Sequence, residues 1–267
     1  MKHTLKITLI LIGMFFLAQL IGIYVANAYL PESVEVINVT TGEVFNETEY
    51  NLPYGLDPPA DTEPKDIVWV ILVAMMIAVI LMLTLMKLKA EIFLRIWFLI
   101  VVILGIGIAL NAFIIGLKSS ALIALVVAIP LGILKIFHRN IIVHNATELL
   151  IYPGIASVFI PLLNIWTVVL LLVLISLYDM YAVWHAGFMQ KMAQYQIKKL
   201  NIFSGFFVPH ISKKVKQKLK KMKKSELKKK KISVSVAVLG GGDVIFPIIA
   251  AGVMLKTLGL MSAVFVI

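Results

Sequence analysis

Long apolar runs constrain the fold of this 267-residue chain more than any other feature. Several of them reach the roughly 18–20 consecutive apolar residues that a helix needs to cross a bilayer. The mean hydropathy is +0.99 and 61% of the residues are hydrophobic, which is too apolar for a soluble domain. The alternating segments of about 10 residues that form membrane barrels are absent. The sequence therefore predicts an all-α, polytopic membrane protein.

The apolar runs predict a single transmembrane domain with seven complete spans and the start of an eighth. The first run is longer than the apolar core of a signal peptide, so we interpret it as a retained helix. Pro130 predicts a kink in the fourth span, and Pro153 and Pro161 predict an irregular fifth span buried among its neighbours. The expected spans are 7–29, 67–86, 96–117, 120–134, 146–163, 165–185 and 242–258, with the eighth beginning over 259–267.

The distribution of charge predicts the orientation of the chain. Residues 31–66 hold nine of the fourteen acidic residues, which predicts an acidic extracytoplasmic loop; Asn38 and Asn46 begin glycosylation-type triplets there. The N-terminal tail and the loops after spans two, four and six hold 22 of the 25 Lys and Arg residues, most of them in the basic loop 186–231. Because cytoplasmic loops are enriched in Lys and Arg, the N-terminus is predicted to be cytoplasmic.

Two aspartates are the exceptional residues of the apolar sequence. Asp179 lies in the sixth predicted span and Asp243 at the start of the seventh. A charged residue at the bilayer centre costs about 2.5–3.5 kcal/mol on insertion scales, so such residues usually have partners and mark functional sites. The two spans run in opposite directions, so we expect both carboxylates in the cytoplasmic third of the membrane, close enough to meet.

Two neighbouring carboxylates can share one proton and so supply an acid and a base together. One carboxylate takes a proton from water as the water attacks an amide carbonyl, and the other protonates the carbonyl oxygen. This chemistry requires neither a metal, nor a cofactor, nor a covalent intermediate. The chain contains no cysteine, which excludes thiolate metal sites.

A strand is predicted immediately before Asp243. Residues 232–238 alternate with period two, and Gly240, Gly241 and Gly242 each disfavour helix by roughly 1 kcal/mol, so we expect the helix to begin at Gly242 or Asp243. The strand would offer an edge to which an unwound substrate could add a strand of its own.

The Tyr178-Asp179 dipeptide and the Gly240-Gly241-Gly242-Asp243 tetrapeptide carry a family resemblance. They resemble the YD and GxGD motifs of the intramembrane aspartyl proteases, the presenilin and signal peptide peptidase family. The runs 205–209 and 243–247 look most like its archaeal branch, and the resemblance extends over spans one to seven. It implies that Asp179 and Asp243 are the catalytic pair and that Tyr178 and the three glycines support them.

The same resemblance implies transmembrane peptide substrates and a multi-pass protein of the archaeal cell membrane. The family also carries a Pro-Ala-Leu motif in a ninth span, and this tripeptide does not occur here. The sequence therefore predicts either a truncated chain or an impaired activity.

Other functions fit parts of the pattern. A proton- or cation-coupled transporter or channel could use the same carboxylates, although the chain shows no obvious inverted repeat. Prepilin-type peptidases also use GxGD, but the Tyr-Asp of span six and aspartates inside the spans disfavour them.

The run Lys213–Lys231, with twelve lysines and one acid, predicts either a helix on anionic headgroups or a solvated loop, and without interleaved aromatics it does not predict nucleic-acid binding. Asn145 and Glu148 are expected to satisfy helix-end groups.

Overall fold

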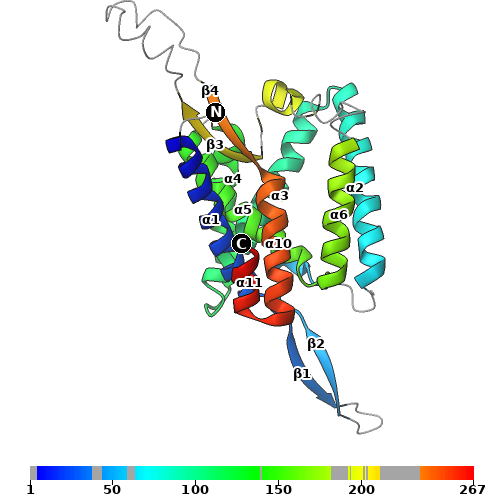
Figure 1. Cartoon of the computed structure of the whole chain (residues 1–267). Coiled ribbons are helices and arrows are strands. Elements are labelled where there is room, and N and C mark those ends of the chain that lie inside the picture. The colour runs from blue at the N-terminus through cyan, green and yellow to red at the C-terminus, as the bar shows by residue number, and fades with distance from the viewer. Residues whose placement is uncertain are drawn as a thin grey trace, which may run out of the picture.

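The computed structural model describes residues 5–37, 44–58, 64–138, 140–181, 192, 194–200, 202, 204–210 and 235–267. Its helices are α1 Leu5–Ala28, α2 Pro64–Lys87, α3 Glu91–Phe113, α4 Ser120–Phe137, α5 Ile141–Phe159, α6 Ile165–Tyr181, α10 Gly241–Leu258 and α11 Leu260–Val266 (Figure 1). Within the described residues, six of these helices are long and apolar enough to cross a membrane, and α6 is a shorter apolar helix. The predicted all-α polytopic membrane fold is therefore confirmed.

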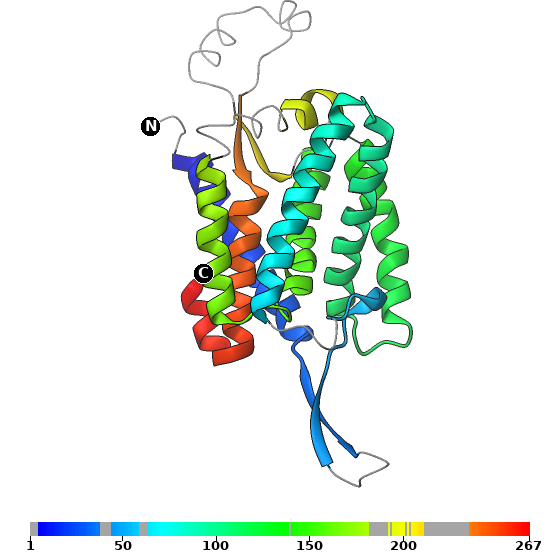
Figure 2. The ribbon, with the colours of Figure 1, turned by 90° about the vertical axis from the view of Figure 1, so that its right-hand side faces the viewer.

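Two small antiparallel sheets lie at opposite ends of the helical bundle (Figure 2). At one end, β1 Glu32–Ile37 pairs with β2 Val44–Glu49 and the hairpin projects away from the helices, followed by the short 3-10 helix η1 Pro53–Gly55. At the other end, after the π-helical turn η3 Gln196–Leu200, β3 Gly205–His210 pairs with β4 Ser235–Gly240. The strand expected before Asp243 is thus present as β4, whereas its partner β3 was not predicted.

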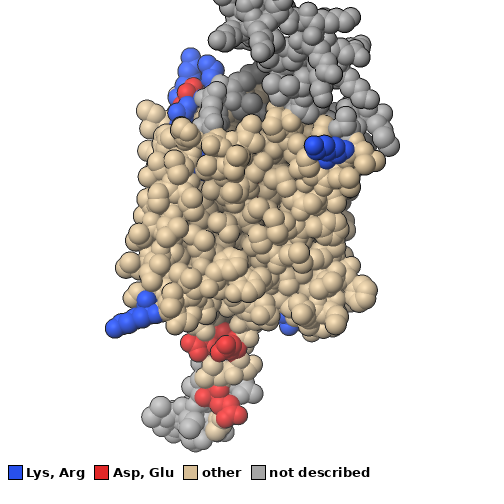
Figure 3. Space-filling model, turned by 90° about the vertical axis from the view of Figure 1, so that its left-hand side faces the viewer, with Lys and Arg blue, Asp and Glu red and all other residues tan. Residues whose placement is uncertain are grey.

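A wide band with few charged side chains separates the two ends of the molecule (Figure 3). Acidic residues gather on the β1–β2 hairpin at one end, within the region expected to form the acidic loop. The run Lys213–Lys231 lies outside the described residues, as does Asn38, so the lipid contact, the glycosylation and the orientation of the chain stay predictions.

Some helix bounds differ from those expected, for identifiable physical reasons. The fifth helix begins at Ile141 rather than near 146, because the side chain of Asn140 caps it by accepting from the N–H groups of Ile142 (2.9 Å) and Val143 (3.4 Å). The expected start of an eighth span is the short helix α11, which lies back against α10 after a reversal at Gly259, where φ is 87°.

Helix α5 is the central helix of the described bundle. It packs against α1, α3, α4 and α10 and has buried residues on most of its circumference, as Pro153 within it and Pro161 beyond its end suggested. A glycine pair brings α5 and α3 into backbone contact, because a Cβ on Gly154 would overlap with the carbonyl group of Gly105. Small residues at such crossings allow membrane helices to approach closely.

A half-buried lysine joins the far end of α10 to the end of α5. The ammonium group of Lys256 donates to the carbonyl oxygens of Ile160 (3.2 Å), Pro161 (3.0 Å) and Leu163 (2.6 Å). These carbonyls follow the last turn of α5, where helical partners run out. The side chain of Lys256 therefore links α10 to the segment after α5 and does not extend towards the headgroups.

The contact between α3 and α5 generates a stability prediction. Replacing Gly154 with Ala should lower the free energy of unfolding by about 1–3 kcal/mol, because the new methyl group must displace the α3 backbone. Thermal unfolding in detergent measures the effect. Gly13→Ala is the matched control, since a Cβ at Gly13 meets nothing within 4 Å. Equal melting temperatures of the two variants would contradict the prediction.

Candidate active site

Asp179 and Asp243 come together between α6 and α10. Asp179 lies in the last turn of α6 and Asp243 in the first turn of α10, and both line one cavity of about 460 Å³. Their carboxylates are close enough for their charges to interact. Neither aspartate is buried by the described residues. Tyr178 is half-buried and interacts electrostatically with Asp179.

The carboxylate of Asp243 lies over the N-terminal end of α10. Gly240 is the N-cap residue of this helix, and a Cβ on Gly240 would be 3.1 Å from Oδ2 of Asp243. The side chain therefore folds back towards the cap. The N-terminal end of a helix carries a partial positive charge, which favours a negative group at this position.

None of the three glycines before Asp243 has a positive φ. Gly240 has an extended backbone with φ −64°, and the described glycines with positive φ are Gly55, Gly205 and Gly259. Gly241 instead provides room, because a Cβ there would be 2.7 Å from Oγ of Ser204 and 3.0 Å from the Tyr152 ring. A Cβ on Gly242 would meet Phe246 at an ordinary 3.6 Å.

The β3–β4 sheet and the start of α10, which together position Asp243, lie beside α1. Val208 of β3 and Ala237 of β4 pack with Ile7 in the first half of α1. Farther along α1, Gln19 contacts Val244 of α10. The depth of Asp243 in the membrane stays a prediction, but along the bundle the residue is level with the middle of α1. The reason is geometric, because a strand advances about 3.3 Å per residue and a helix only 1.5 Å.

Side chains of α5 hold β3 in place. Asn145 makes two hydrogen bonds with the backbone of Phe207: its Nδ2 donates to the carbonyl oxygen (2.8 Å) and its Oδ1 accepts from the N–H (2.9 Å). His144 Nε2 donates to the carbonyl oxygen of Gly205 at 2.8 Å, and the ring of His144 stacks on that of Phe207. Asn145 thus pairs with β3 as a neighbouring strand would.

A buried ion pair completes this attachment. Lys135 of α4 lies 2.6 Å from Oε1 of Glu148 on α5, and their side chains are 4% and 1% exposed. The same Glu148 oxygen accepts from the N–H of Gly205 at 3.5 Å. The expectation that Asn145 and Glu148 satisfy helix ends is therefore wrong, because both bind β3, a strand that was not predicted.

These bonds decide which edge of β4 is open. The N–H and C=O of one strand residue point to the same side, and alternate residues point to opposite sides. Since Phe207 points towards α5, its partner Val238 on β4 points away from β3, and so does Val236. Ala237 directs its backbone into the β3–β4 ladder. Among the described residues this sheet has two strands, so Val236 and Val238 present the outer edge.

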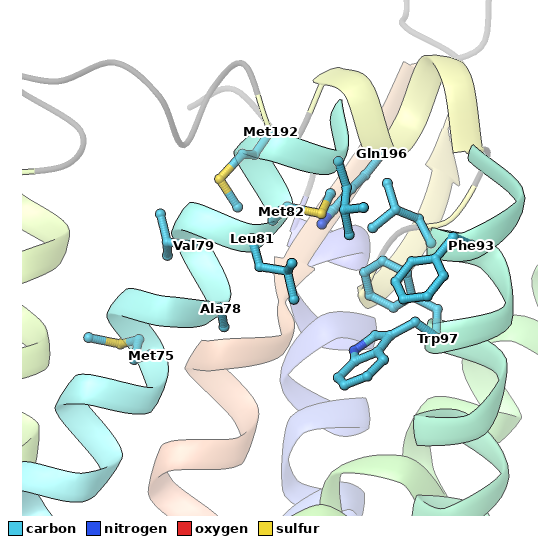
Figure 4. Close-up of a pocket in the computed structure, with 12 residues that line it drawn as sticks. Met75, Ala78, Val79, Leu81, Met82, Phe93, Trp97, Met192 and Gln196 are labelled. Carbon is cyan, nitrogen blue, oxygen red and sulfur yellow. The ribbon is translucent and has the colours of Figure 1, made fainter. Parts of the chain in front are cut away.

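Two further cavities are apolar. One, of about 600 Å³, lies among α2, α5, α6 and α10, and Ile175 and Phe246 line both this cavity and the one that holds the aspartates. The other, of about 260 Å³, lies between α2 and α3, where Phe93 and Trp97 point towards α2 (Figure 4). Neither aspartate lines the cavity between α2 and α3, so it is not the site of the dyad.

Among the described residues, no group of three or more His, Cys, Asp or Glu could hold a metal ion.

Comparison with known families identifies the chain. The family model described as signal-peptide peptidase, presenilin aspartyl protease matches residues 48–265. The chain belongs to this family. Family membership and the apolar helices together make it a multi-pass membrane protein of an aspartyl protease family.

Other comparisons add less. A solved structure described as a presenilin family intramembrane aspartate protease in C222 space group is 17% identical, with a TM-score of 0.47 over 90% of this chain and 73% of that chain. Comparison with curated proteins finds no match.

Sequence reasoning missed several residues around the site. Gln19 is fully buried in α1 and contacts α10 directly after Asp243. An amide in the middle of an apolar span was the available signal, because polar side chains there usually hydrogen-bond across helices. Lys135 was counted as a cytoplasmic surface charge, and its position near a predicted span end gave no hint of its burial.

The attachment of β3 yields a prediction about Asn145. Asn145→Ala should destabilise β3, because the N–H and C=O of Phe207 lose their partners at a cost of about 1–3 kcal/mol each. Amide hydrogen exchange should accelerate at residues 205–210. Asn140→Ala is the control: it removes the α5 cap and should leave exchange in β3 at the parent rate. Unchanged protection of β3 in Asn145→Ala would refute the prediction.

Proposed function

We propose that this chain is an intramembrane aspartyl endopeptidase of the GxGD type, which hydrolyses peptide bonds within membrane-spanning helical substrates. Asp179 and Asp243 are the catalytic pair. The observation that carries the proposal is that both aspartates, one from each of two membrane helices, line a single accessible cavity and interact by charge.

The reaction follows from two carboxylates that share one proton. The ionised aspartate takes a proton from water as the water oxygen bonds to the substrate carbonyl carbon, while the protonated aspartate donates its proton to the carbonyl oxygen. The tetrahedral intermediate then collapses: the C–N bond breaks, the amine leaves with a proton from the first aspartate, and the second regains a proton from the intermediate's hydroxyl. The titration belongs to the pair, so neither residue has a fixed role.

The apolar surroundings of the pair support a substrate that comes from the bilayer. The cavity of about 600 Å³ among α2, α5, α6 and α10 adjoins the dyad through Ile175 and Phe246, and its lining residues are apolar. Such a space can hold apolar side chains of a transmembrane peptide. A helix hides its carbonyls in hydrogen bonds, so the peptide must unwind before water can attack.

The open edge of β4 supports a docking mode for the unwound segment. The outward backbone groups of Val236 and Val238 can pair with an extended peptide, as in β-augmentation. β4 continues directly into the first turn of α10, so a peptide paired there would run towards Asp243. Backbone pairing of this kind places few demands on the sequence of the substrate.

Loss of either carboxylate tests the chemistry. In a proteolysis assay with a membrane-spanning peptide in liposomes, Asp179→Asn and Asp243→Asn should each lower the cleavage rate at least about 100-fold, because the dyad then lacks a member. Asp66→Asn, which removes an exposed acid at the opposite end of the bundle, should cleave at the parent rate. A parent that does not cleave, but shows proton or cation flux abolished by both substitutions, would replace the protease by a transporter.

The docking mode is tested by proline at two neighbouring strand positions. Val236→Pro removes an outward N–H while the β3–β4 ladder persists, so cleavage should be abolished and the melting temperature should change little. Ala237→Pro removes a ladder bond at a buried position and should destabilise the sheet itself. Val236→Thr keeps the N–H and the branched side chain and should cleave normally. Parent-like cleavage by Val236→Pro would exclude the β4 edge as the docking element.

A further inference from the structure

The side chain of Gln19 joins α1 to the first turn of α10. It is 0% exposed, and its Nε2 donates to the carbonyl oxygen of Val244 at 3.0 Å. A carbonyl oxygen can only accept, so the amide nitrogen must face Val244. The amide oxygen of Gln19 is buried without a hydrogen-bond partner among the described residues. A buried amide is costly in hydrocarbon, so this contact holds the side chain in one orientation.

The turn that Gln19 contacts is weakened by a proline. Pro247 lies inside α10 and has no N–H, so the carbonyl of Asp243, four residues earlier, lacks its helical donor. The first turn of α10 is therefore held less firmly than the rest of the helix. Gln19 donates to the carbonyl one residue after Asp243 and supplies a bond from outside the helix at this point.

Beyond Gln19, α1 and α10 are closely packed against each other. A Cβ on Gly22 of α1 would lie 2.6 Å from Cγ2 of Ile248, so the Ile248 side chain of α10 lies directly against the α1 backbone there. One turn farther, a Cβ on Gly252 of α10 would overlap with the side chain of Ile160, which follows α5, and would lie 3.4 Å from Cβ of Ala26 on α1. Small residues at such intervals let membrane helices approach closely. From Gln19 outwards, α10 is thus packed closely against α1.

We propose that Gln19 is a positioning residue for Asp243: its amide fixes the first turn of α10 against α1 so that the carboxylate of Asp243 faces Asp179. The inference rests on the proposed function of the pair. The substrate contacts proposed above lie on β4 and in the apolar cavity, away from Gln19, so we expect Gln19 to act on the chemical step. Loss of its N–H donor lowers kcat and leaves KM near the parent value.

The test uses two substitutions at Gln19. Gln19→Met keeps the length and lacks the donor; its kcat should fall roughly 3- to 20-fold, the range that corresponds to an interhelical hydrogen bond in a membrane. Gln19→Glu can donate to Val244 when its carboxyl is protonated and not when it is ionised. At a pH where this carboxyl is protonated, Gln19→Glu should therefore keep a higher kcat than Gln19→Met, a rescue that depends on the hydrogen-bond donor and not on side-chain volume.

Ser157→Ala is the matched control. It removes another buried hydrogen bond, from Oγ of Ser157 to the carbonyl oxygen of Gly154 at 2.8 Å, on a helix that does not carry either aspartate. Its kcat should stay at the parent value even where its melting temperature falls. An equal fall of kcat in Ser157→Ala and Gln19→Met would overturn the proposal, because general destabilisation would then explain both.

Hydrogen exchange separates this proposal from the proposed function. Amides at residues 244–250 should exchange faster in Gln19→Met than in the parent, whether or not a peptide is cleaved. If the parent does not cleave, the protease assignment fails, and the exchange alone decides whether Gln19 holds the turn. A parent-like kcat in an active Gln19→Met, a kcat of Gln19→Glu at low pH no higher than that of Gln19→Met, or unchanged exchange would each overturn the positioning role.

Discussion

A polar group inside the hydrocarbon core must find its partner within the protein, since no water is present to replace it. This constraint accounts for the polar contacts made by the parts of the structure that are not regular helix. The backbone of β3 meets this requirement on both sides, through β4 on one and through Asn145 and His144 on the other, whereas the outer edge of β4 is open to an added strand. The buried pair Lys135–Glu148 obeys the same rule, as do the three carbonyls that accept from Lys256.

The paired strand makes the site possible. Because β3 is attached to α5, β4 can descend beside the first half of α1 and deliver the N-terminal end of α10 to mid-bundle depth. A helix that begins there exposes a helix terminus, with its partial positive charge, inside the bundle, and Asp243 occupies it. An uninterrupted helix from the β3–β4 end of the bundle would offer no such terminus and no open strand edge beside the carboxylates.

Much of the bundle could be predicted because the signals are local. Apolar runs mark the helices, and a charge inside such a run marks Asp179 and Asp243, whatever surrounds them. The period of two before Gly240 marks β4. Helix ends were harder to predict. The cap by Asn140 places the start of α5 at Ile141, since a single side-chain contact outweighed the apolar pattern. β3 was missed because its stability comes from residues about sixty positions earlier in the chain.

The sequence by itself determined that the chain is a membrane bundle with two acidic side chains inside it, because hydropathy and the cost of buried charge act residue by residue. Only the tertiary structure decided that Gly241 provides room for Ser204 and Tyr152, and that Gln19 bonds to Val244. It alone decided that Lys135 is buried against Glu148 rather than exposed to the headgroups. These are relations between segments distant in the chain, and a hydrogen bond or a steric contact exists only once packing has set both of its partners.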